Sequence, residues 1–77
     1  MTWDPEPADL EWLPGAWQRL TPRQRSAIAL RYLEDLDFAT IAETLRCSQA
    51  TARSHVSRGL ASLREAAPTH EGTQKHA

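Results

Sequence analysis

Apolar residues in the central part of the chain recur at the intervals of an α-helix. Between positions 38 and 45 they are three or four residues apart, which aligns their side chains along one helix face. These residues are Phe38, Ile41, Ala42 and Leu45. From Pro22 to about Glu34 the apolar residues cover more than one face, which predicts a central helix buried on several sides. They are Ala27, Ile28, Ala29, Leu30, Tyr32 and Leu33.

Polar residues and prolines mark the ends of these helices. Thr21 and Gln24 form a capping box around Pro22, which suits the first helical position. Asp37 and Ser48 are suited to cap the two helices that follow them. No segment alternates with the period of two that indicates a strand. The sequence therefore predicts an all-α fold with helices over residues 13–20, 22–34, 38–45 and 49–66.

A three-residue turn, Arg46–Ser48, separates the last two predicted helices. Two helices joined by such a short turn are the signature of a helix-turn-helix motif. The last helix ends before Pro68, because the residue preceding a proline disfavours the α region. We therefore expect a helix-turn-helix domain over residues 13–67, an acidic, flexible arm over residues 1–12 and a disordered tail over residues 68–77.

The last predicted helix has one apolar face and one face of small side chains. At about 100° per residue, the apolar face consists of Ala52, Val56, Gly59, Leu60 and Leu63. The opposite face carries Ala50, Ser54, Ser57, Arg58 and Ala61, with Arg53 on one flank and Thr51 and His55 on the other. Small side chains let a helix approach base edges in the major groove of DNA, and the arginines can reach guanine or phosphate. A solvated face of an ordinary amphipathic helix is the alternative.

The arginines are concentrated in two segments that contain no acid. One segment has Arg19, Arg23, Arg25 and Arg31, and the other has Arg46, Arg53, Arg58 and Arg64. The net charge of −1 does not by itself favour nucleic acid, but a sum near zero can hide a basic face. Guanidinium groups make forked contacts to phosphate and guanine. Charge alone leaves both DNA binding and a solvated surface open.

Other functional classes lack the residues that they need. Cys47 is the single cysteine and the histidines are scattered, so we expect no disulfide and no metal site, and Cys47 is predicted to fill the core at the turn. No Gly-rich phosphate loop, activated nucleophile or carboxylate pair is present, which predicts no enzyme activity, cofactor or small-molecule substrate. No apolar run approaches the roughly 20 residues of a membrane span, and no secretion signal opens the chain, so we expect a cytoplasmic protein without membrane contact.

The order of several short motifs resembles region 4 of extracytoplasmic-function type bacterial sigma factors. The motifs are Leu20-Thr21-Pro22-Arg23-Gln24-Arg25, Leu30-Arg31-Tyr32-Leu33-Glu34-Asp35-Leu36, Ile41-Ala42-Glu43-Thr44-Leu45, Cys47-Ser48 and the run from Ser54 to Glu65. Each motif alone is weak, but together they cover residues 20–65 in the order and spacing of that family.

This resemblance implies a bundle of three to four helices without strands, of the winged-helix-like region 4 type. It also implies binding of double-stranded DNA at the −35 promoter element and docking on the flap of the RNA polymerase β subunit. The resemblance places the DNA contacts of the family at the start of the last predicted helix, and the outward face of that helix adds further positions. Together the candidate DNA-binding residues are Ser48, Gln49, Ala50, Thr51, Arg53, Ser54, Ser57 and Arg58. Among them, Arg53 is expected to contact bases and Arg58 to lie nearer the DNA backbone.

The sequence departs from the family pattern at three points. Arg46 stands where the family usually has Gly, which costs roughly 1 kcal/mol or more if the backbone there is left-handed. Ala52 replaces the usual Val and makes the core thinner. We expect region 2, which melts the −10 element in that family, to be missing from a chain of this length. We therefore expect a stand-alone regulator, half of a split sigma factor with a separate region 2 protein, or a fragment, and no independent initiation.

Two alternatives fit the same residues. The DNA-binding domain of LuxR-type regulators shares Leu20-Thr21-Pro22-Arg23 and Ser54-His55-Val56-Ser57 and keeps both the fold and the DNA binding. The second alternative is a protein-interaction module that binds RNA polymerase or an anti-sigma factor. Trp3, Trp12 and Trp17 bear on it, because Trp is enriched at interfaces. Trp17 is expected to pack on the bundle, whereas the roles of Trp3 and Trp12 are open.

In a further hypothesis, the acidic arm folds onto the basic face and weakens DNA binding.

Overall fold

Four α-helices make up the fold. The computed structural model describes residues 10–68, so the predictions for Trp3, for most of the arm and for the tail beyond Pro68 lie outside the described residues. The helices are α1 (Leu13–Arg19), α2 (Pro22–Tyr32), α3 (Phe38–Leu45) and α4 (Gln49–Ala66). No strand occurs within residues 10–68, which confirms the predicted all-α class.

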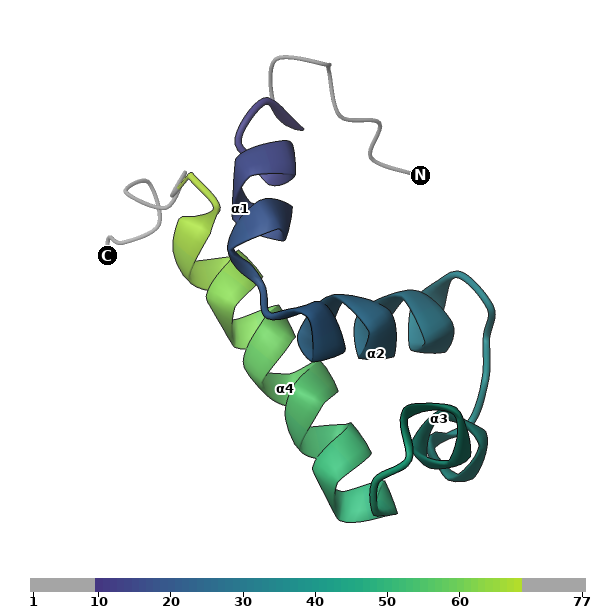
Figure 1. Cartoon of the computed structure of the whole chain (residues 1–77). Helices are drawn as coiled ribbons and strands as arrows, with labels where there is room; N and C mark the ends of the chain where they lie inside the picture. The colour runs from purple at the N-terminus through teal and green to yellow at the C-terminus, as the bar shows by residue number, and fades with distance from the viewer. Residues whose placement is uncertain (1–9, 69–77) are drawn as a thin grey trace, which may run out of the picture.

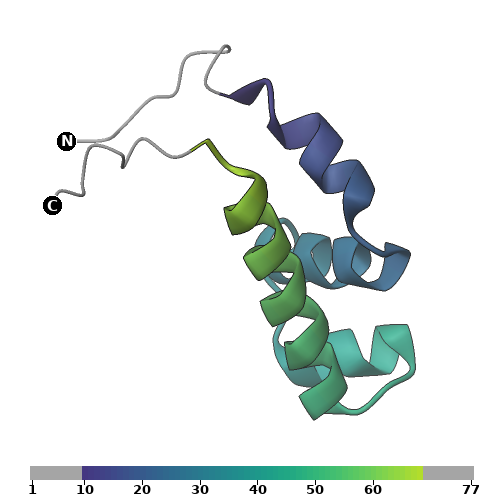
Figure 2. The same ribbon diagram turned by 90° about the vertical axis from the view of Figure 1, so that its left-hand side faces the viewer.

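Helix α4 is the element on which the other helices are assembled. In Figure 1 it runs diagonally, with α1 near its C-terminal half, α2 across its middle and α3 beside its N-terminal end. In Figure 2, after a quarter turn, α4 lies in front and the other helices lie behind it or to one side. One long side of α4 is therefore packed, and the opposite side is left uncovered by the rest of the described chain.

Helices α2, α3 and α4 begin where short-range capping predicts. The Thr21 hydroxyl accepts a hydrogen bond from the backbone N–H of Gln24 at 3.1 Å, and the Gln24 side chain accepts one from the N–H of Thr21 at 3.2 Å. Asp37 and Ser48 accept hydrogen bonds from the backbone N–H groups three residues ahead, at 2.9 and 3.0 Å. All three predicted N-caps are confirmed, because each uses a side chain only three residues from its partner.

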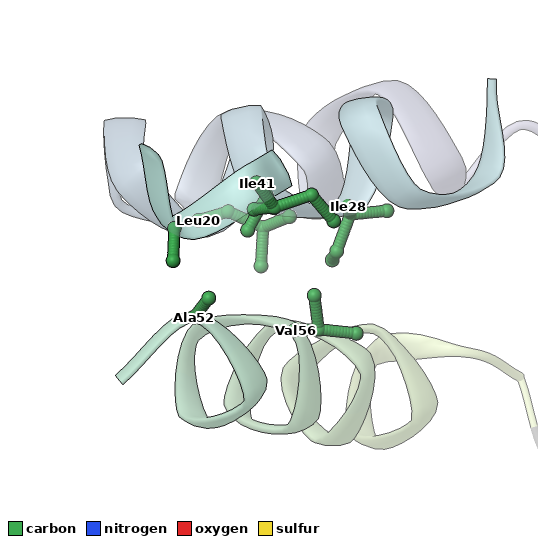
Figure 3. Packing of buried hydrophobic residues seen from close by; sticks show 7 residues of the cluster. Leu20, Ile28, Ile41, Ala52 and Val56 are labelled. Atoms are coloured by element: carbon green, nitrogen blue, oxygen red, sulfur yellow. The ribbon is translucent and has the colours of Figure 1, made fainter. Parts of the chain in front are cut away.

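The core is small and is made of aliphatic side chains from α2, α3 and α4 and of Leu20 at the end of α1. Leu20, Ile28 and Ile41 point toward Ala52 and Val56 of α4 (Figure 3), and neither Ile41 nor Ala52 has any solvent-exposed area. Trp17 and Cys47 pack against this cluster, as their sequence contexts predict, together with Leu30, Leu36, Phe38, Leu45, Leu60 and Leu63. The predicted apolar face of the last helix is thus the face that closes the core.

The C-terminal end of α2 differs from the prediction. The helix ends at Tyr32 rather than near Glu34, and Tyr32 and Leu33 are 59% and 80% exposed rather than buried. The chain leaves the helix through Asp35, which adopts the left-handed conformation at φ 58°, and turns back toward α3. The apolar side chains of Tyr32 and Leu33 therefore meet solvent at this end of α2.

Two arginines of the first basic segment, Arg23 and Arg25, stabilise helix ends. Arg25 donates hydrogen bonds to the carbonyl oxygens of Leu20 and Gln18, at 2.8 and 3.3 Å, and so holds the end of α1 against α2. Arg23 donates to the carbonyl of Leu45, the last residue of α3. A cation at a helix C-terminus also complements the negative end of the helix dipole. Part of the positive charge that suggested a basic surface therefore stabilises contacts between the helices of the bundle.

Candidate nucleic-acid interface

The predicted contact residues lie together on the uncovered side and N-terminal end of α4. Ser48 precedes the helix and the others belong to its first three turns. All eight are exposed: Ser48, Gln49, Ala50, Thr51, Arg53, Ser54, Ser57 and Arg58. The two other positions predicted on or beside this face, His55 and Ala61, are half-buried, so they mark its edges. Figure 2 shows the helix turned toward the viewer with no other described helix in front of it.

The N-terminal end of α4 is organised by two hydroxyl groups. The Ser48 hydroxyl accepts a hydrogen bond from the backbone N–H of Thr51 and donates one to the Thr51 hydroxyl, both at 3.0 Å. The first intrahelical hydrogen bond runs from Ala52 to the carbonyl of Ser48 at 2.9 Å. The N–H groups of Gln49 and Ala50 precede that bond and have no partner inside the helix. They and the helix dipole favour an anion such as phosphate at this end.

Arg53 has a defined place beside the first turn of α3. Its guanidinium carbon, Cζ, lies 5.0 Å from the centroid of the Phe38 ring, within the range of a cation–π contact. Arg31 of α2 contacts the same ring at 4.8 Å and also donates a hydrogen bond to the Leu36 carbonyl at 3.0 Å. Phe38 therefore joins one arginine that is fixed in the fold to one that lies on the exposed face.

Arg58 and Arg46 are the other two cations near this surface. Arg58 is exposed and makes no hydrogen bond or ring contact with any described residue, so its charge is available to a partner. Arg46 ends α3 in the left-handed conformation, at φ 59° and ψ 54°. This is the backbone conformation for which glycine would be the unstrained residue, so the departure from the family pattern at position 46 carries its expected cost.

The acidic group nearest in sequence to Phe38 is a structural cap. The backbone N–H and the hydroxyl of Thr40 hydrogen-bond to the Asp37 carboxylate and hold its pKa below the ordinary value of 3.8, and the charge of Arg31 acts in the same direction. Asp37 is therefore ionised at neutral pH. Between Arg46 and Arg64 the chain has no acid, so the part of α4 that holds the candidate residues carries only positive formal charge; the one acid of α4, Glu65, lies in its last turn.

The described residues form neither a metal site nor a membrane-spanning helix. Within residues 10–68, no group of three or more His, Cys, Asp or Glu side chains is placed to hold a metal ion. No helix in that range combines the length and apolar character needed to cross a bilayer. What the arrangement can do is place small side chains, donor groups and guanidinium ions along one exposed helix.

Sequence reasoning missed Phe38 and Arg31 as supports of this surface. Phe38 was predicted only as a core residue, and it does pack on the core, but its ring also contacts two guanidinium groups. Arg31 was grouped with the general basic charge. The sequence contains no signal for this arrangement, because the three residues come from three helices and are brought together only by helix packing.

Comparison with known proteins gives one family match. A family model described as "Sigma-70, region 4" matches residues 10–63, which are most of the chain and contain all of the helix-turn-helix elements up to the last turn of α4. No curated protein and no solved structure matches the chain significantly.

Proposed function

The chain belongs to the sigma-70 region 4 family, and from that premise we propose that α4 reads a −35-like promoter element in double-stranded DNA. The family is one of DNA-binding domains that act in transcription initiation and interact with RNA polymerase, not a family of enzymes. The match favours region 4 over the LuxR-type alternative. A protein that acts on promoters in bacteria works in the cytoplasm, which is the location that we propose.

The observation that carries this proposal is the uncovered outward face of α4, on which all eight candidate residues are exposed. In the proposed complex this face lies in the major groove. Arg53 contacts a base edge, and guanine is the base for which an arginine fork is best suited. Arg58 and the N-terminal end of α4 contact phosphates, which set the orientation of the helix and add little sequence information.

Selection from a random duplex DNA library, at low and moderate salt, tests this function. Wild-type protein and Arg53→Ala are compared side by side. A short enriched motif that the variant loses supports sequence recognition by α4. Salt-sensitive binding without a motif limits the interaction to phosphates, and no binding even at low salt contradicts the proposal. Arg64→Ala is a matched control, because Arg64 lies in the last turn of α4, away from the candidate residues.

A specific observation also favours a protein partner. Tyr32 and Leu33 form an exposed apolar pair at the C-terminal end of α2, which points away from α4 in Figure 1. We propose that this pair contributes to docking on the RNA polymerase β flap. An exposed pair of large apolar side chains is a typical anchor for a protein partner. An anti-sigma factor, or a separate region 2 protein, is the alternative occupant.

Pull-down of purified β-flap segment by the chain tests the docking proposal. The variant Tyr32→Ser/Leu33→Ser should lose the flap and keep the DNA motif of the wild type. Retention of the flap by this variant contradicts a role for the pair. The same variant tested against an anti-sigma factor or a region 2 protein shows whether another partner uses this surface.

A further inference from the structure

We infer that Phe38 is a positioning residue that holds the Arg53 guanidinium in place for base recognition, an inference that rests on the function proposed above. The Arg53 Cζ atom lies 5.0 Å from the centroid of the Phe38 ring. Within the described residues the Arg53 side chain makes no hydrogen bond and no ring contact besides this one, and Arg53 is exposed. The position of its guanidinium therefore depends on the ring.

The ring is itself held in place by the fold. Phe38 is half-buried and packs against the hydrophobic core, and it begins α3 directly after the Asp37 cap. Arg31 contacts the same ring at 4.8 Å and is fixed by its 3.0 Å hydrogen bond to the Leu36 carbonyl. The ring thus belongs to the rigid part of the bundle, although one of its two cationic neighbours belongs to the exposed face.

A ring contact suits an arginine that must recognise a base. A carbonyl or carboxylate partner would occupy some of the five N–H donors of the guanidinium group, whereas an aromatic ring occupies none of them. The donor fork of Arg53 is left free for the two acceptors of a guanine edge. Holding the group in advance also reduces the side-chain entropy lost on binding.

The other arginines of the chain show the contrast. Arg23, Arg25 and Arg31 each donate to backbone carbonyl oxygens and so have fewer free donors. Arg58 has no described contact and keeps its full rotamer freedom, which is tolerable for a phosphate contact but poorly suited to reading one base. Arg53 combines a fixed position with a free donor set.

The test compares Phe38→Leu, which keeps an apolar side chain and removes the aromatic ring, with Phe38→Tyr, which keeps the ring. For each protein the affinity for the selected duplex is divided by the affinity for a scrambled duplex. We expect Phe38→Leu to lower this ratio about two- to fivefold, the range that a cation–π contact at an exposed site contributes. Phe38→Tyr should retain the wild-type ratio. An unchanged ratio in Phe38→Leu overturns the inference, even if the affinity for both duplexes falls by the same factor.

A second measurement does not depend on DNA. The Arg53 Nε–Hε order parameter in the free, full chain should be high in wild type and in Phe38→Tyr, and low in Phe38→Leu. Equal order in all three proteins overturns the inference. If wild type binds no DNA, the proposed function fails, and this measurement still decides whether Phe38 positions Arg53. The same order parameter for Arg31 is the internal control, because its hydrogen bond to Leu36 remains in the Leu variant.

Discussion

Gly59 of α4 lies so close to Ile28 of α2 that a Cβ atom at position 59 would stand 2.5 Å from Ile28 Cδ1 and 3.4 Å from Ile28 Cγ1. Gly59 is buried, and both helices continue without interruption through this contact. The absence of a side chain at position 59 therefore leaves room for the end of the Ile28 side chain against α4. Gly15 of α1 is different, because a Cβ atom there would have no neighbour within 4 Å.

These two glycines should respond to substitution in opposite directions. Gly59→Val pushes the end of the Ile28 side chain aside and crowds the α2–α4 contact, which should lower the free energy of unfolding by about 1–3 kcal/mol, the usual cost of overpacking. Gly15→Ala should raise it by about 0.5–1 kcal/mol, because alanine loses less conformational entropy in a helix. Urea unfolding followed by circular dichroism measures both. Equal stability of wild type and Gly59→Val would show that Ile28 makes room for the new side chain at no net cost.

Arg46 should be a site of stored backbone strain. Its φ of 59° is left-handed, and glycine reaches this conformation without the Cβ clash. Arg46→Gly should therefore raise the free energy of unfolding by about 0.5–1 kcal/mol. Arg46→Ala is the matched control: it removes the same side chain but keeps the Cβ atom, and its stability should stay near that of wild type. If the Ala and Gly variants are equally stable, the gain in the free energy of unfolding does not come from relief of backbone strain.

The Asp37 cap should make stability depend on acid pH. The hydrogen bonds from Thr40 lower the pKa of Asp37 in the folded state below 3.8, so the folded protein binds the proton less readily than the unfolded chain. The stabilisation is fully present above pH 3.8 and is lost as the pH falls through the lower, folded-state pKa. Asp37→Asn keeps a capping oxygen without the charge.

The difference in Tm between wild type and Asp37→Asn isolates this one group, because other carboxylates titrate in both proteins. It should be constant from pH 7 down to about pH 5 and should shrink below pH 3.8. A difference that does not change over the acid range would mean that the charge of Asp37 contributes nothing to the cap.

Arg53 and Arg58 should differ in how their loss affects DNA binding. Arg58→Ala should weaken binding to all duplexes alike and should reduce the slope of log K against log salt by about 1, as expected for one lost phosphate contact. Arg53→Ala should instead cost about 1–3 kcal/mol on the preferred duplex and much less on a scrambled one. Fluorescence anisotropy at several salt concentrations measures both effects. The assignment of roles fails if the two variants behave alike.

Much of the candidate surface could be predicted because it belongs to a single helix. Ser48 and the residues from Gln49 to Arg58 follow one another in the chain, so helical periodicity alone decides which of them share a face. The exposure of all eight agrees with that prediction, although their contact with DNA stays a proposal. The support given by Phe38 could not be predicted, because periodicity within one helix says nothing about which residue of another helix lies beside it.

The sequence by itself determined where α2, α3 and α4 begin and which side of α4 faces the core. Capping by Thr21, Asp37 and Ser48 acts over three residues, and amphipathic periodicity acts over one or two helical turns, so both are set by neighbours in the chain. Tertiary packing alone decided which arginines close helix ends, how closely Gly59 meets Ile28, and that the Arg53 guanidinium lies over the Phe38 ring. These features join residues of different helices, and their distances depend on how the helices cross.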